Sequence, residues 1–77
     1  MLNEDVLKII GKELKLTRIE HNMNLQEVSD KTGIAITTIS NYENSKTQMY
    51  MDKILDILKA YDDVTPSIFF KRITTKM

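Results

Sequence analysis

Residues 24–44 read NLQEVSDKTGIAITTISNYEN, and this stretch decides how the chain folds. Asn24 is suited to cap a helix, because Glu27 stands three residues later and its side chain can reach back to the Asn24 amide in a capping box. Gly33 is suited to the left-handed conformation that ends many helices. We therefore expect a tight turn at Gly33 between two short helices, over residues 25–32 and 36–44.

Two short helices with a tight turn between them are the helix-turn-helix pattern. Upstream of them, Leu7, Ile10 and Leu14 recur at spacings of three and four, which is typical of a helix with one buried face. Gly11 interrupts this helix and indicates that another backbone packs close to it. Downstream, Pro66 is suited to the first turn of a last helix. The other three helices are expected over residues 4–21, 51–61 and 66–72.

The composition favours helices throughout the chain. Two glycines and one proline in 77 residues leave few breakers, and no segment alternates apolar and polar residues for long enough to predict a strand. We therefore expect an all-α fold, a compact five-helix bundle that forms one domain over residues 1–77. A chain this short has little room for a catalytic cleft and its supporting shell, so an enzyme is not expected.

The charges of the chain balance. Eleven Lys and Arg residues stand against eleven Asp and Glu residues, which gives a formal net charge of zero. Any attraction to a polyanion must therefore come from the local placement of lysines. The lysines that could supply it are Lys8, Lys12, Lys31, Lys46 and Lys53.

Several classes of site are not expected. The chain has no cysteine and one histidine, His21, which leaves no combination of residues for a metal site and predicts no cofactor. No apolar run approaches the roughly 20 residues that a bilayer span requires, so we expect no membrane contact and a cytoplasmic location. No small-molecule substrate is evident.

The chain carries a series of elements in a fixed order. They are Ile10-Gly11, then Leu14 and Arg18, then NLQEVS at 24–29, TGI at 32–34, TISNYEN at 38–44, Ile54 and Ile57, and VTPSIF at 64–69. In this order the chain resembles the Cro and phage-repressor class of helix-turn-helix domains, also called the xenobiotic-response-element family. The resemblance implies a lambda-repressor-like DNA-binding domain with double-stranded DNA as its partner.

The resemblance implies that residues 36–44 form a recognition helix, whose first turns reach base edges in the major groove. By position, the base-reading candidates are Ile36, Thr37, Thr38 and Asn41. Because asparagine pairs with adenine and methyl groups contact thymine, a half-site rich in A·T pairs is expected. The resemblance also implies a partly buried ion pair between Arg18 and Glu43. In the alternative interpretation, Ile36 is a buried staple and Asn41 a solvated helix residue.

Contacts to the DNA backbone are expected from helix N-termini and from polar side chains beside the recognition helix. The candidates are Gln26, Ser40, Asn44, Lys46 and Thr47. The chain departs from the family pattern at several positions. Leu25 stands where a phosphate-binding glutamine is common, Ala35 replaces a capping Ser or Thr, and Ser45 replaces a glycine. One extra residue lies at Asp62-Asp63.

Large apolar residues cluster near the end of the chain. Five of them lie within ten residues, namely Tyr61, Val64, Ile68, Phe69 and Phe70. Contiguous apolar surface on a small protein marks a partner site, so these residues are candidates for a homodimer contact. The alternative is that they simply close the core. The segment SIFFKRI at 67–73 is similar to the controller proteins of restriction-modification systems.

Taken together, these features predict a homodimeric, sequence-specific transcriptional regulator that binds an inverted-repeat operator. The sequence leaves open whether it represses by occlusion or activates through a polymerase contact. The alternative is a protein-interaction module of the same fold, antitoxin-like or regulator-binding, in which DNA binding is secondary.

Overall fold

The computed structural model describes residues 3–77, and this part of the chain is all-α, with no strand. Its five helices are α1 (Glu4–Glu20), α2 (Leu25–Thr32), α3 (Ile36–Glu43), α4 (Met51–Leu58) and α5 (Pro66–Thr75). The all-α, five-helix fold expected from the sequence is therefore confirmed. Met1 and Leu2, at the start of the domain expected over residues 1–77, lie outside the described residues.

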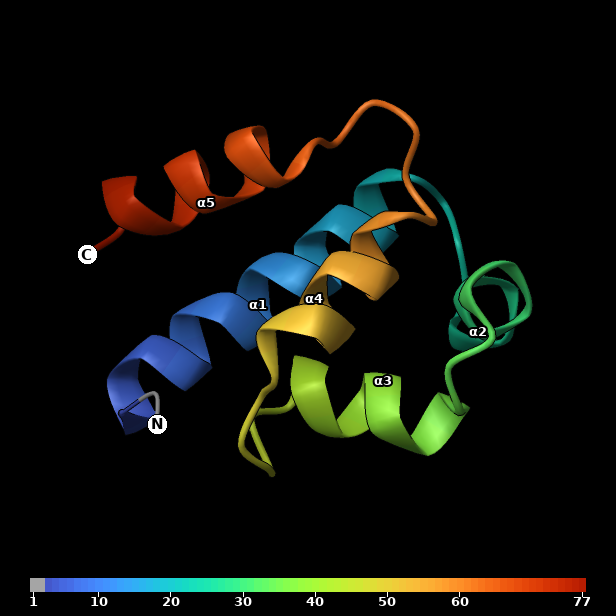
Figure 1. Ribbon diagram of the computed structural model, residues 1–77, viewed down its shortest axis with the longest axis horizontal. Coiled ribbons are helices and arrows are strands. Elements are labelled where there is room, and N and C mark those ends of the chain that lie inside the picture. Colours follow the sequence, from blue (N-terminus) through green and yellow to red (C-terminus); the bar gives the residue numbers. More distant parts are fainter. Residues whose placement is uncertain (1–2) are drawn as a thin grey trace.

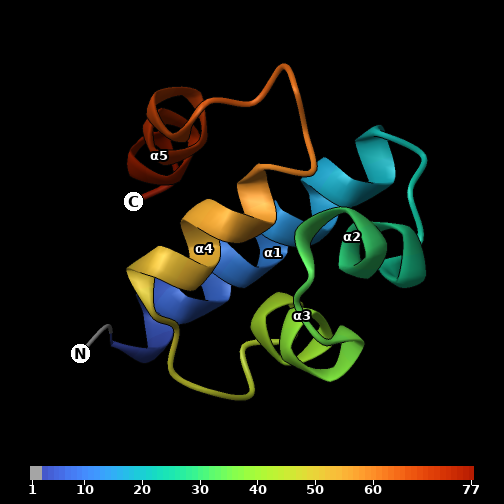
Figure 2. The same ribbon diagram turned by 45° about the vertical axis from the view of Figure 1, so that its right-hand side comes forward.

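The long helix α1 runs through the middle of the molecule. Helices α3 and α5 both pack against it, from opposite sides, as Figure 1 shows. Helix α2 packs against α3 and α4, and Figure 2 shows it beside the first turn of α3. The helix-turn-helix formed by α2 and α3 is therefore on the side of the molecule that faces away from α5.

One apolar core joins all five helices. Side chains at 2% exposure or less come from each of them and include Leu14, Val28, Ile39, Ile54 and Phe69. The predicted inward face of the first helix is confirmed, because Leu7, Ile10 and Leu14 are all buried. Burial on this scale is the main term that stabilises a small domain.

The ends of four helices differ from the expected ones, and α1 and α3 each end one residue earlier, at Glu20 and Glu43. Helix α4 ends at Leu58 rather than residue 61, because the hydrogen bonds after Leu58 no longer follow the α-helical pattern. The amides of Ala60 and Tyr61 donate to the carbonyl oxygens three residues earlier, as in a 3₁₀ turn. Helix α5 continues to Thr75 rather than residue 72, and Ile73 in its added turn is buried in the core. The added turn of α5 follows from the tertiary packing of Ile73 rather than from a local sequence signal.

The contact between α1 and α3 is unusually close at Gly11. A Cβ atom on Gly11 would lie 2.5 Å from the Tyr42 carbonyl oxygen and 2.9 Å from the Glu43 carbonyl oxygen. The close backbone approach predicted from this glycine is confirmed. Just beyond α3, Ser45 has a positive φ of 57° and its hydroxyl donates to the Leu7 carbonyl oxygen at 2.9 Å. The end of α3 is thereby fixed to the first half of α1.

Helix α5 is fixed to α1 by a buried carboxylate. Glu13 is 3% exposed and lies within an ion cluster on the side of α1 that faces α5. Lys76 donates to one of its carboxylate oxygens, and Arg72 lies 3.8 Å from the other. The two cations hold the C-terminal half of α5 in place.

Candidate nucleic-acid interface

The turn between α2 and α3 is set by hydrogen bonds that the local sequence specifies. Asn24 and Glu27 form both bonds of the predicted capping box, at 2.8 and 3.1 Å. Gly33 closes α2 with a φ of 75°, in the left-handed region. The Ser29 hydroxyl then donates to the Ile34 carbonyl oxygen at 2.7 Å. These bonds fix the angle at which α3 leaves α2.

Helix α3 has one face in the core and one at the surface. Ile39, Tyr42 and Glu43 are buried, while Thr37 and Asn44 are exposed. The half-buried residues of the outward face are Ile36, Thr38, Ser40 and Asn41. All four base-reading candidates from the sequence therefore retain surface that a ligand can reach.

An ion pair holds the inward side of α3 against α1. Arg18 donates through Nε and Nη2 to the two carboxylate oxygens of Glu43, at 2.8 and 3.1 Å, and Nη1 donates to the Met23 carbonyl oxygen at 2.9 Å. The hydrogen bond to Glu43 raises the pKa of Arg18. Beside the pair, burial raises the pKa of Tyr61 to about 12. Both carboxylate oxygens of Glu43 and all three nitrogens of the Arg18 guanidinium have hydrogen-bond partners, and such partners are what make a buried pair tolerable.

The backbone-contact candidates lie in three different settings. Gln26 is exposed at the start of α2 and donates to Asp30 of its own helix at 2.8 Å. Asn44 donates to the Ser40 carbonyl and hydroxyl oxygens, at 2.9 and 3.3 Å, so these two side chains act as a unit. Lys46 and Thr47 are exposed in the loop after α3.

A shallow depression lies between the outward face of α3 and the start of α4. Thr38 and Asn41 line it from α3, and Thr47, Tyr50 and Lys53 line it from the other side. Tyr50, which sequence reasoning did not select, is 67% exposed there. Tyr50 is the N-cap residue of α4, and its side chain forms no cap hydrogen bond. Its amide donates to the Tyr42 hydroxyl oxygen at 3.1 Å, which fixes the loop. The sequence alone could not identify Tyr50, because a tyrosine just before a helix can lie either in the core or at the surface.

The five residues predicted for a homodimer contact fall into two groups. Tyr61, Val64 and Phe69 are 3%, 5% and 0% exposed, so they belong to the core of a single chain. This outcome follows the alternative interpretation, in which such residues close the core. Ile68 is 41% exposed and Phe70 is half-buried, so the candidate contact narrows to these two.

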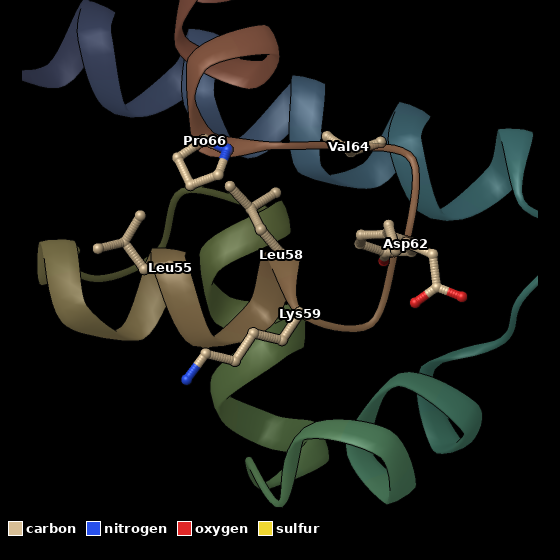
Figure 3. Close-up of a pocket in the computed structure, with 7 residues that line it drawn as sticks. Leu55, Leu58, Lys59, Asp62, Val64 and Pro66 are labelled. Atoms are coloured by element: carbon tan, nitrogen blue, oxygen red, sulfur yellow. The ribbon is translucent and has the colours of Figure 1, made fainter.

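An apolar groove lies between α4 and the start of α5. Leu55, Leu58, Val64 and Pro66 line it together with Lys59 and Asp62. Figure 3 shows the Leu58 side chain pointing toward Pro66, with Leu55 one turn away on the same helix. This groove shares no lining residue with the depression beside the outward face of α3.

Two further features are absent from the described residues 3–77. In this part of the chain, no group of three His, Cys, Asp or Glu residues could hold a metal ion. Among the same residues, no helix has the length and apolar character needed to cross a membrane. His21 pairs with Asp63 and stacks at a tilt on Tyr61, with 4.9 Å between ring centroids.

An all-α domain that presents one helix of a helix-turn-helix on its surface belongs to a class of DNA-binding domains. The comparison with family models agrees, since residues 11–71 match the model of a helix-turn-helix domain. The chain therefore belongs to the helix-turn-helix domain family. This family is typically a non-enzymatic DNA-binding fold. Comparisons with curated proteins and with solved structures gave no match.

Proposed function

We propose that this protein is a sequence-specific transcriptional regulator that binds double-stranded DNA through α3. One observation carries the proposal: α3 keeps a polar outward face at the surface, while Arg18 and Glu43 hold its inward face rigidly on α1. A recognition helix needs both properties, because base-edge contacts require a fixed orientation in the groove. Within the helix-turn-helix family, the motif order supports a place in the Cro and phage-repressor class.

Residues at different positions on the outward face are proposed to contact different parts of the DNA. Thr37, Thr38 and Asn41 lie in its first turns and supply hydroxyl, methyl and amide groups for base edges. Ile36 adds an apolar contact for a thymine methyl group. Gln26, Ser40, Asn44, Lys46 and Thr47 flank this set and are the proposed backbone contacts.

We further propose a homodimer that presents two copies of α3 to an inverted repeat. The proposed dimer contact combines the apolar groove of Leu55 and Pro66 with Ile68 and Phe70, which follow Pro66 on α5. Met51 extends the same apolar surface of α4 and is 52% exposed. Two recognition helices in such a dimer bind half-sites about 34 Å apart, one turn of DNA.

A second candidate function is a protein-interaction module of the same fold. The zero net charge favours it, because phosphate neutralisation supplies most of the affinity of non-specific DNA binding. In this alternative a partner protein, rather than a second copy, covers the groove between α4 and α5.

Fluorescence anisotropy with the DNA upstream of the protein's own coding sequence tests the first proposal. The titration uses that fragment and a scrambled duplex at two salt concentrations, and light scattering gives the mass of the free protein. We expect tight binding to the upstream fragment alone, a steep loss of affinity with salt, and a dimer mass. Equally weak binding to both duplexes by a monomer would favour the protein-interaction module.

A further inference from the structure

Three lysines form a basic strip along α1 that the proposed function does not yet use. Lys8, Lys12 and Lys15 follow one another at spacings of four and three, which places them on one face of the helix. All three are exposed, and none of them forms an ion pair within residues 3–77. Their charges are therefore available to a ligand.

The basic strip borders the end of α3. Lys8, Lys12 and Lys15 line one depression together with Asn44 and Ser45, and with the carboxylates of Glu4 and Glu43. The Glu43 carboxylate is already neutralised by Arg18, so Glu4 alone opposes the three lysines among the lining residues. The close packing at Gly11 and the bond from Ser45 to Leu7 fix this arrangement.

Lysines consequently lie on both flanks of α3. On one flank, Thr38 and Asn41 share a depression with Thr47 and Lys53. On the other flank, Asn44 shares its depression with the basic strip of α1. A helix in the major groove has a phosphate chain on each side, so cations on both flanks match the charge pattern of a duplex.

We propose that Lys8, Lys12 and Lys15 bind backbone phosphates of the DNA beyond the C-terminal end of α3. This inference rests on the proposed function, since it lengthens the same interface along one strand. It also gives a chain of zero net charge a local site for a polyanion, because Lys8, Lys12 and Lys15 gather on one face beside the end of α3.

The test measures the salt dependence of binding for charge-removing variants. Lys12→Gln and Lys71→Gln are a matched pair, because each removes one charge from an exposed helical position, and Lys71 lies on α5, away from α3. The triple variant Lys8→Gln, Lys12→Gln, Lys15→Gln removes the whole strip. Binding is measured by anisotropy on the upstream duplex and on a scrambled duplex, and circular dichroism checks the fold.

We expect the triple variant to lower the slope of log K against log salt by about 2 to 3, near one per lost phosphate contact. Lys12→Gln should weaken binding to both duplexes by the same factor, because phosphates carry no sequence information. Lys71→Gln should leave the slope and both affinities unchanged.

The inference and the proposed function fail differently. If the wild-type protein binds and Asn41→Ala weakens its specific site, but the triple variant keeps the wild-type slope, the strip does not contact DNA and only the inference fails. An equal effect of Lys71→Gln and Lys12→Gln would also overturn it, because the loss would then reflect overall charge. If the wild-type protein binds neither duplex, the inference and the proposed function are both overturned.

Discussion

At the scale of single residues, the position of a side chain on α3 decides which part of the DNA it can contact. A base contact reads the DNA sequence, whereas a backbone contact only fixes the orientation of the protein on the DNA. Asn41 is half-buried at the centre of the outward face, where its amide can pair with an adenine edge. We expect Asn41→Ala to weaken binding to the specific site by about 1–3 kcal/mol and to relax preference at one base position. Competition titrations with single-base operator variants measure both effects.

Asn44→Ala is the matched control for this variant. Asn44 is the C-cap residue of α3, three residues after Asn41, and is a proposed backbone contact. Its loss should therefore weaken binding to all duplexes by a similar factor. If base preference is unchanged in Asn41→Ala, Asn41 is not one of the residues that read sequence.

The pair of His21 and Asp63 makes stability depend on pH. The imidazole Nε2 lies 2.5 Å from the Asp63 carboxylate and Nδ1 lies 2.7 Å from the Thr17 carbonyl oxygen. The bond to Asp63, and then the bond to Thr17, raise the pKa of His21, while the same pair lowers the pKa of Asp63. The pair is fully charged between the ordinary pKa of an aspartate and that of a histidine.

Folding therefore favours the protonated imidazole. Its contribution to the free energy of unfolding is complete below the unfolded pKa of about 6.5 and is lost as pH rises through the higher folded pKa. We expect urea midpoints to fall between pH 6 and pH 8.5 in the wild-type protein, with a smaller fall in Asp63→Asn. NMR titration of the His21 ring should give a pKa above 6.5, and an equal pH dependence in both proteins would contradict this account.

At the scale of elements, α3 begins without a side-chain cap. Ala35 occupies the N-cap position with φ −59° and ψ 141°, and no side chain bonds to the first amides of the helix. A serine hydroxyl at this position can accept from one of them. We expect Ala35→Ser to raise the free energy of unfolding by about 0.5–2 kcal/mol, measured by urea denaturation.

Ala35→Gly is the comparison for the capping effect, since it changes the backbone without adding an acceptor. The rise should appear in the serine variant and not in the glycine variant. A serine variant no more stable than the wild-type protein would mean that water or another group already satisfies these amides.

Local signals in the sequence were sufficient for the elements whose ends are set by side-chain caps. Asn24, Glu27 and Gly33 define α2 by short-range hydrogen bonds and one positive φ, and both ends were predicted. The ends of α4 and α5 were missed because they depend on what the last turn packs against. The buried carboxylate of Glu13 was missed for the same reason: its partners, Arg72 and Lys76, lie about sixty residues away along the chain.

At the scale of the whole molecule, the apolar residues near the C-terminus divide between core and surface. The sequence shows how many apolar residues lie there but not which of them are buried. That depends on the direction of α5 relative to α1, which decides which face of α5 is covered. Phe69 is completely buried, whereas its neighbour Ile68 is 41% exposed. The candidate residues of the outward face of α3, in contrast, came from the resemblance to the Cro and phage-repressor class, and Ile36, Thr37, Thr38 and Asn41 all keep exposed surface.

This division predicts opposite outcomes for two neighbouring substitutions. Phe69→Asp should unfold the protein, because truncating a buried phenylalanine to alanine already costs about 3–5 kcal/mol and aspartate adds a buried charge. Ile68→Asp should keep the helical circular dichroism spectrum but convert the proposed dimer to a monomer in light scattering. A folded Phe69→Asp monomer would show that Phe69 is in the dimer contact rather than the core.

The outward face of α3 is the proposed DNA-binding surface. The most direct test is a two-dimensional NMR titration of the ¹⁵N-labelled protein with its upstream duplex. We predict amide shifts over residues 36–47, at the start of α2 and along Lys8, Lys12 and Lys15, with little change over the exposed face of α5. Shifts confined to the groove of Leu55 and Pro66, with α3 unchanged, would contradict the proposal.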